Sequence, residues 1–173
     1  QAVADLEQLG YNNKDTDGYL IDAGKKITFT LVCNEENAVR LSAANLIASA
    51  FKAIGIELQV KKLKWADYTA ALAAGNFDLY LAEMKIPNNF DVFPMVTSAY
   101  GIAADSATYL AAQQLNAGTG SVEEVISCMN EDMLLIPLCH RSGVITHTAA
   151  LTGTLTPGFS DIFAGLEDCT LGS

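Results

Sequence analysis

Two kinds of hydrophobic periodicity alternate along the first half of this chain. Residues 26–33 (KITFTLVC) alternate β-branched and other apolar positions, which predicts a strand. From about Asn37 to Ile54 the apolar residues recur at helical spacing, and Gly55 is suited to end that helix. Alternation resumes over residues 56–61, which predicts a second strand directly after the helix.

The same order is repeated further along the chain. A short helix is predicted to begin at Trp65 and to end near Ala74, and a third strand follows over residues 77–81. Strands separated by single helices imply right-handed crossovers and a parallel sheet. We therefore expect an α/β fold, with a mixed, largely parallel sheet and helices on both faces.

The rest of the chain is less regular. Residues 12–18 read as a turn-rich loop, because the acidic end position of a calcium loop is missing. Residues 86–101 carry Pro, Asn and Gly without periodicity. Ser121 and Glu124 have the spacing of a capping box. We expect further helices over 2–9, 104–115 and 121–132, and strands over 134–139 and 144–148.

Composition narrows the class of protein. The 173 residues suit one globular domain, since 50% are apolar and 17% are charged. The net charge of −10 argues against a nucleic-acid partner, which needs a basic face. The one basic cluster, Lys61, Lys62 and Lys64, is read as a solvated strand edge in preference to an anion site.

No catalytic or metal-binding constellation stands out. The four cysteines form no CxxC pair. We expect buried free thiols, because Cys33 and Cys139 each end an apolar run, where a thiol behaves as a small hydrophobic group. A single disulfide is the alternative. Structural or exposed roles are favoured for His140 and His147 over metal ligation. We expect neither an enzyme nor a cofactor or metal site.

Charged groups at the predicted strand ends give more information about a binding site than the cysteines and histidines do. Glu83 ends the third strand, and Arg141 follows the run LLIPLC and could reach the same side of the sheet. The simpler interpretation is a structural ion pair or two exposed strand ends. The sharper one is that Glu83, Asp91 and Arg141 line a ligand cleft, since ligands gather at the carboxyl ends of parallel strands.

Several segments follow one another in the order of a known family. They are LEQLGY, the loop ending in DGY, residues 26–60, the WADY segment, GNFDLYLAEM and MNEDMLLIPLCHRSG. In this the chain resembles the extracytoplasmic solute-binding proteins of ABC importers, most closely the oligopeptide, dipeptide and nickel class called family 5. The resemblance covers nearly the whole chain.

This resemblance implies one lobe of a two-lobed, periplasmic-binding-protein-like type II fold. Residues 1–150 would form the C-terminal ligand-binding lobe, and residues 151–173 a tail that returns toward an N-terminal lobe. No such lobe precedes Gln1, so we expect a fragment of a longer protein.

The implied function is capture of a solute, foremost an oligopeptide, and its delivery to an ABC permease by hinge closure of the two lobes. The implied protein is a monomer in the periplasm, or a lipoprotein on the outer face of the cell membrane. Its membrane contact would be an N-terminal lipid anchor absent from this chain. The alternative is a ligand-sensing module that uses the same lobe in a regulatory protein.

Strand-end position and the family alignment together select the candidate ligand-binding residues. They are Asn34, Trp65, Glu83, Met84, Asn88, Asp91 and Arg141. In many peptide binders of the family a Trp follows the third strand, and a later Asp holds the peptide's amino terminus. Here Met84 matches the Trp position and that Asp is displaced. Either Asp91 substitutes for it, or the ligand is not a peptide with a free amine.

Overall fold

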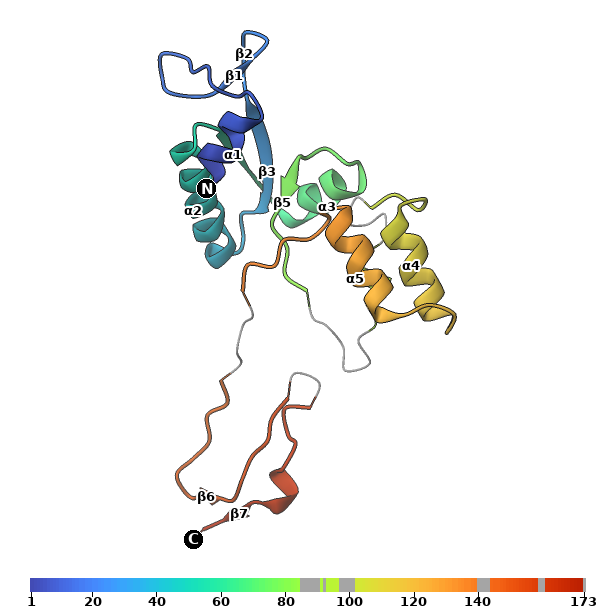
Figure 1. Ribbon diagram of the computed structural model, residues 1–173. Helices are drawn as coiled ribbons and strands as arrows, with labels where there is room; N and C mark the ends of the chain where they lie inside the picture. The colour runs from blue at the N-terminus through green and yellow to red at the C-terminus, as the bar shows by residue number, and fades with distance from the viewer. Residues whose placement is uncertain (85–90, 92, 97–101, 140–143, 159–160, 173) are drawn as a thin grey trace. The chain divides into compact units, whose positions relative to one another are not determined.

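The computed structural model describes residues 1–84, 91, 93–96, 102–139, 144–158 and 161–172 (Figure 1). The chain divides into two compact units. The first unit comprises Gln1–Met84 and Met95–Leu110, and the second comprises Lys85–Pro94 and Ala111–Ser173.

A three-stranded parallel sheet is the centre of the first unit. Strand β3 (Thr28–Asn34) lies between β4 (Glu57–Leu63) and β5 (Leu79–Tyr80). Both neighbours run parallel to it, and the pairing with β4 is unbroken from one end of the strand to the other. The predicted parallel sheet is confirmed, with a third strand shorter than the alternation over residues 77–81 indicated.

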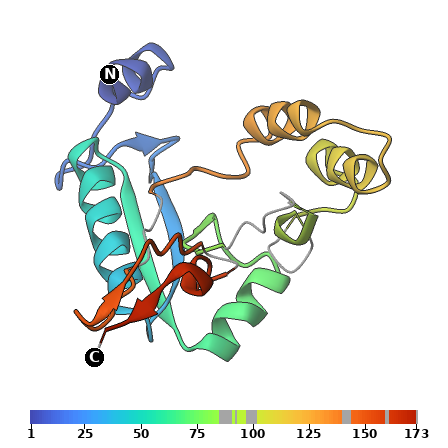
Figure 2. The same cartoon turned by 90° about the horizontal axis from the view of Figure 1, so that it is seen from below.

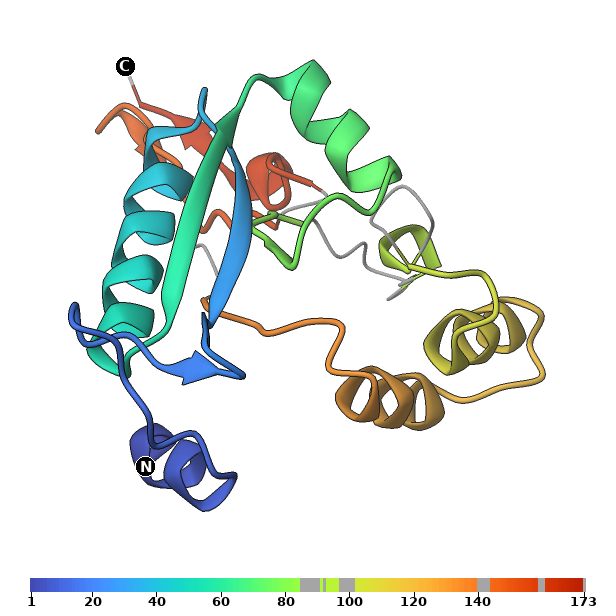
Figure 3. The ribbon, with the colours of Figure 1, turned by 90° about the horizontal axis from the view of Figure 1, so that it is seen from above.

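Helices cover both faces of this sheet, as predicted. Helix α2 (Ala38–Ala53) packs on the face that carries Leu31 and Cys33, whereas α3 (Trp65–Ala73) packs on the face that carries Val32 (Figure 3). The two faces separate because successive side chains of a strand point in opposite directions. Burying one large apolar side chain such as Leu31 contributes about 1.5–3 kcal/mol, so these two layers hold the unit together.

The connection between α2 and β4 is short and depends on glycine. The helix begins at the N-cap residue Asn37, whose Oδ1 accepts a hydrogen bond from the backbone N–H of Arg40 at 3.0 Å. Its last residue is Ala53, and Gly55 follows shortly after with a φ of +85°, which lies in the left-handed region. A Cβ atom there would also lie 3.2 Å from the side chain of Leu20. Only glycine satisfies both conditions.

A helix and a small hairpin precede the sheet in the chain. Helix α1 (Ala2–Gln8) ends in a Schellman motif, in which Tyr11 N–H donates to Leu6 C=O and Gly10 N–H to Glu7 C=O. A small hairpin follows, made of β1 (Ile21–Asp22) and β2 (Lys25–Lys26).

The loop over residues 12–18 is confirmed. Its Asp15 carboxylate accepts hydrogen bonds from the backbone N–H groups of Asp17 and Tyr19, at 3.0 and 2.8 Å. The other oxygen of Asp15 pairs with Lys26 at 3.7 Å. The carboxylate of Asp15 therefore stabilises a turn.

The remaining elements are short. They are the 3-10 turn η1 (Phe93–Met95), helices α4 (Ala107–Asn116) and α5 (Val122–Glu131), strands β6 (Leu151–Thr152) and β7 (Thr170–Leu171), and the 3-10 turn η3 (Leu166–Asp168). Ser121 caps α5 by accepting a hydrogen bond from the Glu124 N–H at 3.1 Å. Strands β6 and β7 pair antiparallel (Figure 2). Within the described part of the chain, no helix combines the length and apolar character that a membrane crossing requires.

Two predicted strands are wrong. Residues 134–139 and 144–148 run without strand structure and without a ladder partner in the described part of the chain. Most of their apolar side chains are exposed, among them Ile136, Leu138 and Val144. An apolar run forms a strand only when a neighbouring strand completes its backbone hydrogen bonds, and the run alone does not supply that neighbour.

Candidate ligand-binding site at the carboxyl ends of the strands

The carboxyl ends of the three parallel strands form one edge of the first unit (Figure 3). Asn34 ends β3 opposite Leu63 at the end of β4. On the other side of β3, the N–H of Leu81 donates to the carbonyl of Val32 at 3.1 Å, which extends the pairing beyond β5. We call Asn34, Trp65, Glu83 and Met84 the strand-end rim, since each was predicted to bind ligand and each follows or ends one of these strands.

Asn34 is buried at the turn from β3 into α2. Its side chain is 7% exposed, and its Oδ1 accepts a hydrogen bond from the N–H of Glu36 at 3.0 Å. The N–H of Glu35 donates to the carbonyl of Leu63 at 2.8 Å, so the turn is fastened to the neighbouring strand as well. The Asn34 side chain therefore stabilises the turn that carries this part of the rim.

Trp65 presents an aromatic surface at the start of α3. It is 54% exposed, and its ring stacks on that of Tyr68 at a centroid distance of 5.7 Å and an interplanar angle of 27°. Tyr68 is buried, and its hydroxyl donates to the carbonyl of Leu81 at 3.1 Å. A large aromatic ring held by a buried neighbour suits stacking or apolar contact with a ligand.

Glu83 carries the rim's negative charge and is paired with Arg40. The Nη2 atom of Arg40 lies 3.2 Å from Oε2 of Glu83. The side chain of Arg40 is 19% exposed and that of Glu83 is 40% exposed, so Arg40 is the less exposed member of the pair. Sequence reasoning had proposed Arg141 as the partner; Arg141 lies outside the described residues.

Sequence reasoning missed Arg40. The signal was available, because Arg40 is the first basic residue of the helix that follows β3. In a parallel βαβ unit that helix begins at the carboxyl edge of the sheet, where the rim is. A cation in the first turn of α2 can therefore pair with a carboxylate that follows β5, the strand that lies next to β3 in the sheet.

The remaining predicted site residues are Met84, which belongs to the rim, and Asp91 and Asn88. Met84 is partly buried directly after Glu83. Asp91 belongs to the second unit, where its Oδ1 accepts a hydrogen bond from the N–H of Phe93 at 3.0 Å and starts η1. Asn88 lies outside the described residues. A role in ligand binding for these residues stays a prediction.

The four cysteines differ in burial. All four cysteines are free; Cys33 is buried as predicted, whereas Cys139 is exposed because its run forms no strand. Burial raises the pKa of the Cys33 thiol above its ordinary value, against the opposing charges of Arg40 and Lys62, so it stays protonated at neutral pH. Nδ1 of His147 lies 2.9 Å from the carbonyl oxygen of Thr148.

A metal site is not evident either. Among the residues that the structure describes, no three His, Cys, Asp or Glu side chains are grouped closely enough to hold an ion. The rim offers instead one paired carboxylate, one exposed aromatic ring and a buried amide. Such a set suits non-covalent recognition of a ligand with a positive group and an apolar group.

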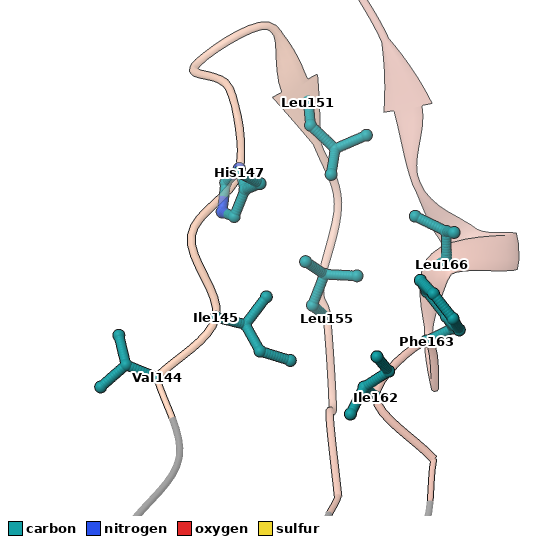
Figure 4. Close-up of a pocket in the computed structure, with 8 residues that line it drawn as sticks. All are labelled: Val144, Ile145, His147, Leu151, Leu155, Ile162, Phe163 and Leu166. Carbon is teal, nitrogen blue, oxygen red and sulfur yellow. The ribbon is translucent and has the colours of Figure 1, made fainter.

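The second unit contains a hollow of different character. It has a volume of about 390 Å³ (Figure 4), and its walls are apolar apart from one imidazole. The residues that line it are Val144, Ile145, His147, Leu151, Leu155, Ile162, Phe163 and Leu166. A solute site normally adds several placed polar groups to its apolar walls, so this hollow is better suited to packing against another apolar surface.

Comparison with known proteins agrees with the fold. Residues 1–107 match the family model described as bacterial extracellular solute-binding proteins, family 5 middle. A probable ABC transporter-binding protein of Deinococcus radiodurans is 39% identical over 70 residues, which are 40% of this chain and 12% of that protein. The oligopeptide-binding protein AppA of Bacillus subtilis is 30% identical over 93 residues, which are 51% of this chain and 17% of AppA.

The fold is also found in solved structures. A periplasmic oligopeptide-binding protein of an oligopeptide ABC transporter from Thermotoga maritima superposes with a TM-score of 0.70 at 19% identity. The match covers 95% of this chain and 35% of that one. The matched parts thus make up well under half of each relative's length. The α/β architecture predicted from the sequence is that of periplasmic binding proteins.

Proposed function

Because this chain belongs to the bacterial extracellular solute-binding proteins of family 5, we propose that it carries the ligand-binding lobe of an ABC importer's solute-binding protein. The proposal assigns it no enzymatic activity. It would work outside the cytoplasmic membrane, as a monomeric lipoprotein or in the periplasm, and deliver its ligand to an ABC permease. The named relatives support this assignment, since they are an ABC transporter-binding protein and oligopeptide-binding proteins.

We further propose that the ligand is an oligopeptide. This proposal rests on two groups of the rim. The half-exposed carboxylate of Glu83 lies on the same edge of the sheet as the exposed ring of Trp65. A carboxylate suits the ammonium group of a peptide, and an exposed ring suits apolar or aromatic side chains. Met84, Asn88, Asp91 and Arg141 would complete the binding surface.

The lobe would act by hinge closure. We propose that residues 1–150 form the ligand-binding lobe and that residues 151–173 pack against a second lobe. The apolar hollow in the second unit supports this, because its side chains from the tail include exposed Ile162, Phe163 and Leu166, whose burial would contribute about 25 cal/mol per Å² of apolar surface covered. The relatives are much longer than this chain, and the additional length is enough to form a second lobe. Closure of two lobes encloses a ligand that one lobe alone holds weakly.

Native mass spectrometry of the complete gene product, purified without denaturation, tests the ligand class. We expect a ladder of bound masses that fits short peptides. Unfolding and refolding should empty the protein, and a defined mixture of tripeptides to pentapeptides should restore the bound species. A single non-peptide mass, such as a metal complex, or an empty protein that ignores the peptide mixture, would overturn the peptide assignment.

A further inference from the structure

Trp65 lies on the side of α3 that faces the sheet, and yet it is exposed. The large apolar and aromatic side chains of this helix are those of Trp65, Tyr68 and Leu72, and a spacing of three and then four residues places them on one helical face. Tyr68 and Leu72 are 3% and 2% exposed, whereas Trp65 is 54% exposed. A residue on this face is ordinarily buried, so the exposure of Trp65 needs a structural reason.

The reason is the place at which the helix begins. Strand β4 ends at Leu63, one residue follows, and Trp65 is the first residue of α3 (Figure 3). Strands β3 and β4 end in register, with Asn34 opposite Leu63, so the sheet reaches its carboxyl edge just before Trp65. Helical side chains also tilt toward the amino terminus of their helix. Trp65 therefore projects past the end of the sheet, at the edge where parallel sheets bind ligands.

A fixed ring supports the indole of Trp65. The indole stacks on the ring of Tyr68 at a centroid distance of 5.7 Å and an interplanar angle of 27°. Tyr68 is packed in the core cluster of Val32 and Leu72, and its hydroxyl donates to the carbonyl of Leu81 at 3.1 Å. An aromatic surface that is held in place by a buried neighbour, and is more than half exposed, can stack on a further ring at a small cost in conformational freedom.

We propose that Trp65 is a specificity-determining residue, and that its ring, supported by Tyr68, forms a subsite for an aromatic side chain of the bound peptide. The inference rests on the proposed function and deepens it, since it names the kind of side chain that the rim selects. Aromatic rings attract one another in offset arrangements beyond the gain from covering apolar area. An aromatic side chain should therefore bind better here than a saturated ring of the same size.

The test uses the complete gene product and a set of tripeptide probes. The set contains trialanine, the three tripeptides in which phenylalanine replaces one alanine, and the same three with cyclohexylalanine instead. Cyclohexylalanine has nearly the size of phenylalanine but no π face, so it separates ring stacking from simple burial. Dissociation constants are measured by calorimetry for the wild type, W65F, W65L and F29L.

F29L is the matched control. Phe29 lies near the amino-terminal end of β3, in the same sheet but away from the rim, and it is 36% exposed. This variant exchanges an aromatic side chain for leucine, as W65L does, without touching the proposed subsite.

We expect the wild type to bind one of the three phenylalanine tripeptides about tenfold more tightly than trialanine, and about threefold more tightly than its cyclohexylalanine counterpart. W65L should bind trialanine as the wild type does but lose the preference for phenylalanine over cyclohexylalanine. W65F keeps a ring and should retain part of that preference, and F29L should retain all of it.

Fluorescence gives a second readout that belongs to Trp65 itself, and it needs only W65F if W65L does not fold. The difference between the emission spectra of the wild type and W65F isolates the Trp65 indole. We expect the preferred phenylalanine tripeptide to shift this difference spectrum to shorter wavelength, because stacking removes water from the ring. Trialanine should shift it less.

Two failures are distinguishable. If the wild type binds none of the tripeptides, the proposed peptide function is wrong and this inference falls with it. If the wild type binds them without preferring phenylalanine, if W65L keeps the preference or weakens all probes equally, or if the Trp65 emission does not change on binding, the proposed function stands. In each of these cases the aromatic subsite is not at Trp65 and the inference is overturned.

Discussion

The hydroxyl of Tyr68 donates to the carbonyl of Leu81 at 3.1 Å, and this bond joins α3 to the backbone just beyond β5. Tyr68 also supports the exposed ring of Trp65 by stacking against it. One buried tyrosine thus places two parts of the strand-end rim, the aromatic ring at the start of α3 and the segment that carries Glu83. The buried Tyr68 side chain thus positions residues of the rim from within the protein.

The Tyr68 hydroxyl should contribute measurably to stability. We expect Y68F to lower the free energy of unfolding by about 1 kcal/mol, because the carbonyl of Leu81 loses its donor. Urea denaturation followed by circular dichroism measures the change. Y11F is the matched control, since Tyr11 lies on the loop after α1, and should change the free energy by no more than about 0.5 kcal/mol. Equal effects of both variants would contradict the assigned role.

Much of the first unit could be predicted from the sequence, because several local signals agreed there. The helical and alternating periodicities changed at Gly55 and again near Gly75, and both glycines have positive φ in the structure. The short connections then left few topologies. For residues 134–139 the only signal was an apolar run. They form no strand because strand formation depends on a neighbouring strand elsewhere in the fold, which the run itself does not specify.

The candidate site was predictable only in part. Strand-end position brought Asn34, Trp65 and Glu83 to one edge, as the parallel topology requires. Arg40 was missed because the helical pattern alone does not show which distant side chain it will meet, although its place in the first turn of α2 could have indicated the carboxyl edge of the sheet. Asp91 was grouped with Glu83 by strand-end position and the family alignment, yet it belongs to the other compact unit, where its Oδ1 accepts a hydrogen bond from the nearby Phe93 N–H.

The core between α2 and the sheet should be sensitive to truncation. Leu31 is buried against α2 on the central strand, and we expect L31A to cost about 2–5 kcal/mol through lost burial and the cavity left behind. Leu46 lies on α2 itself but is 72% exposed. L46A should therefore cost less than about 1 kcal/mol in the same urea titration. A comparable loss in both variants would show that the packing assigned to β3 is wrong.

The cysteines should react in a defined order. Cys139 is exposed and Cys33 is buried, with a thiol whose pKa is raised by that burial. Iodoacetamide at neutral pH should label Cys139 rapidly and Cys33 only after unfolding, because the thiolate is the reactive form. Peptide mapping by mass spectrometry follows each site, and a sample in guanidinium chloride is the control for intrinsic reactivity. Rapid labelling of Cys33 in the folded protein would contradict its burial.

Glu57 should make stability depend on pH in the acid range. Its carboxylate accepts a hydrogen bond from Thr28 at 2.9 Å and one from Gln59 at 3.2 Å, and it pairs with Lys26 at 3.7 Å. These contacts, foremost the bond from Thr28, hold the pKa of Glu57 below its ordinary value of 4.5. A carboxylate with a lowered pKa stabilises the fold above its unfolded pKa, and this contribution is lost as the pH falls through the folded pKa.

We therefore expect E57Q to be less stable than the wild type at pH 7 and the difference to shrink below about pH 4. Removing any acid also relieves self-repulsion in a chain of net charge −10, which would raise stability and obscure the effect. E123Q corrects for this, because Glu123 is an exposed acid in the first turn of α5. Urea midpoints of the three proteins from pH 7 to pH 3 give the comparison. A difference between E57Q and E123Q that stays constant over this range would show that the contacts of Glu57 do not favour its ionised form.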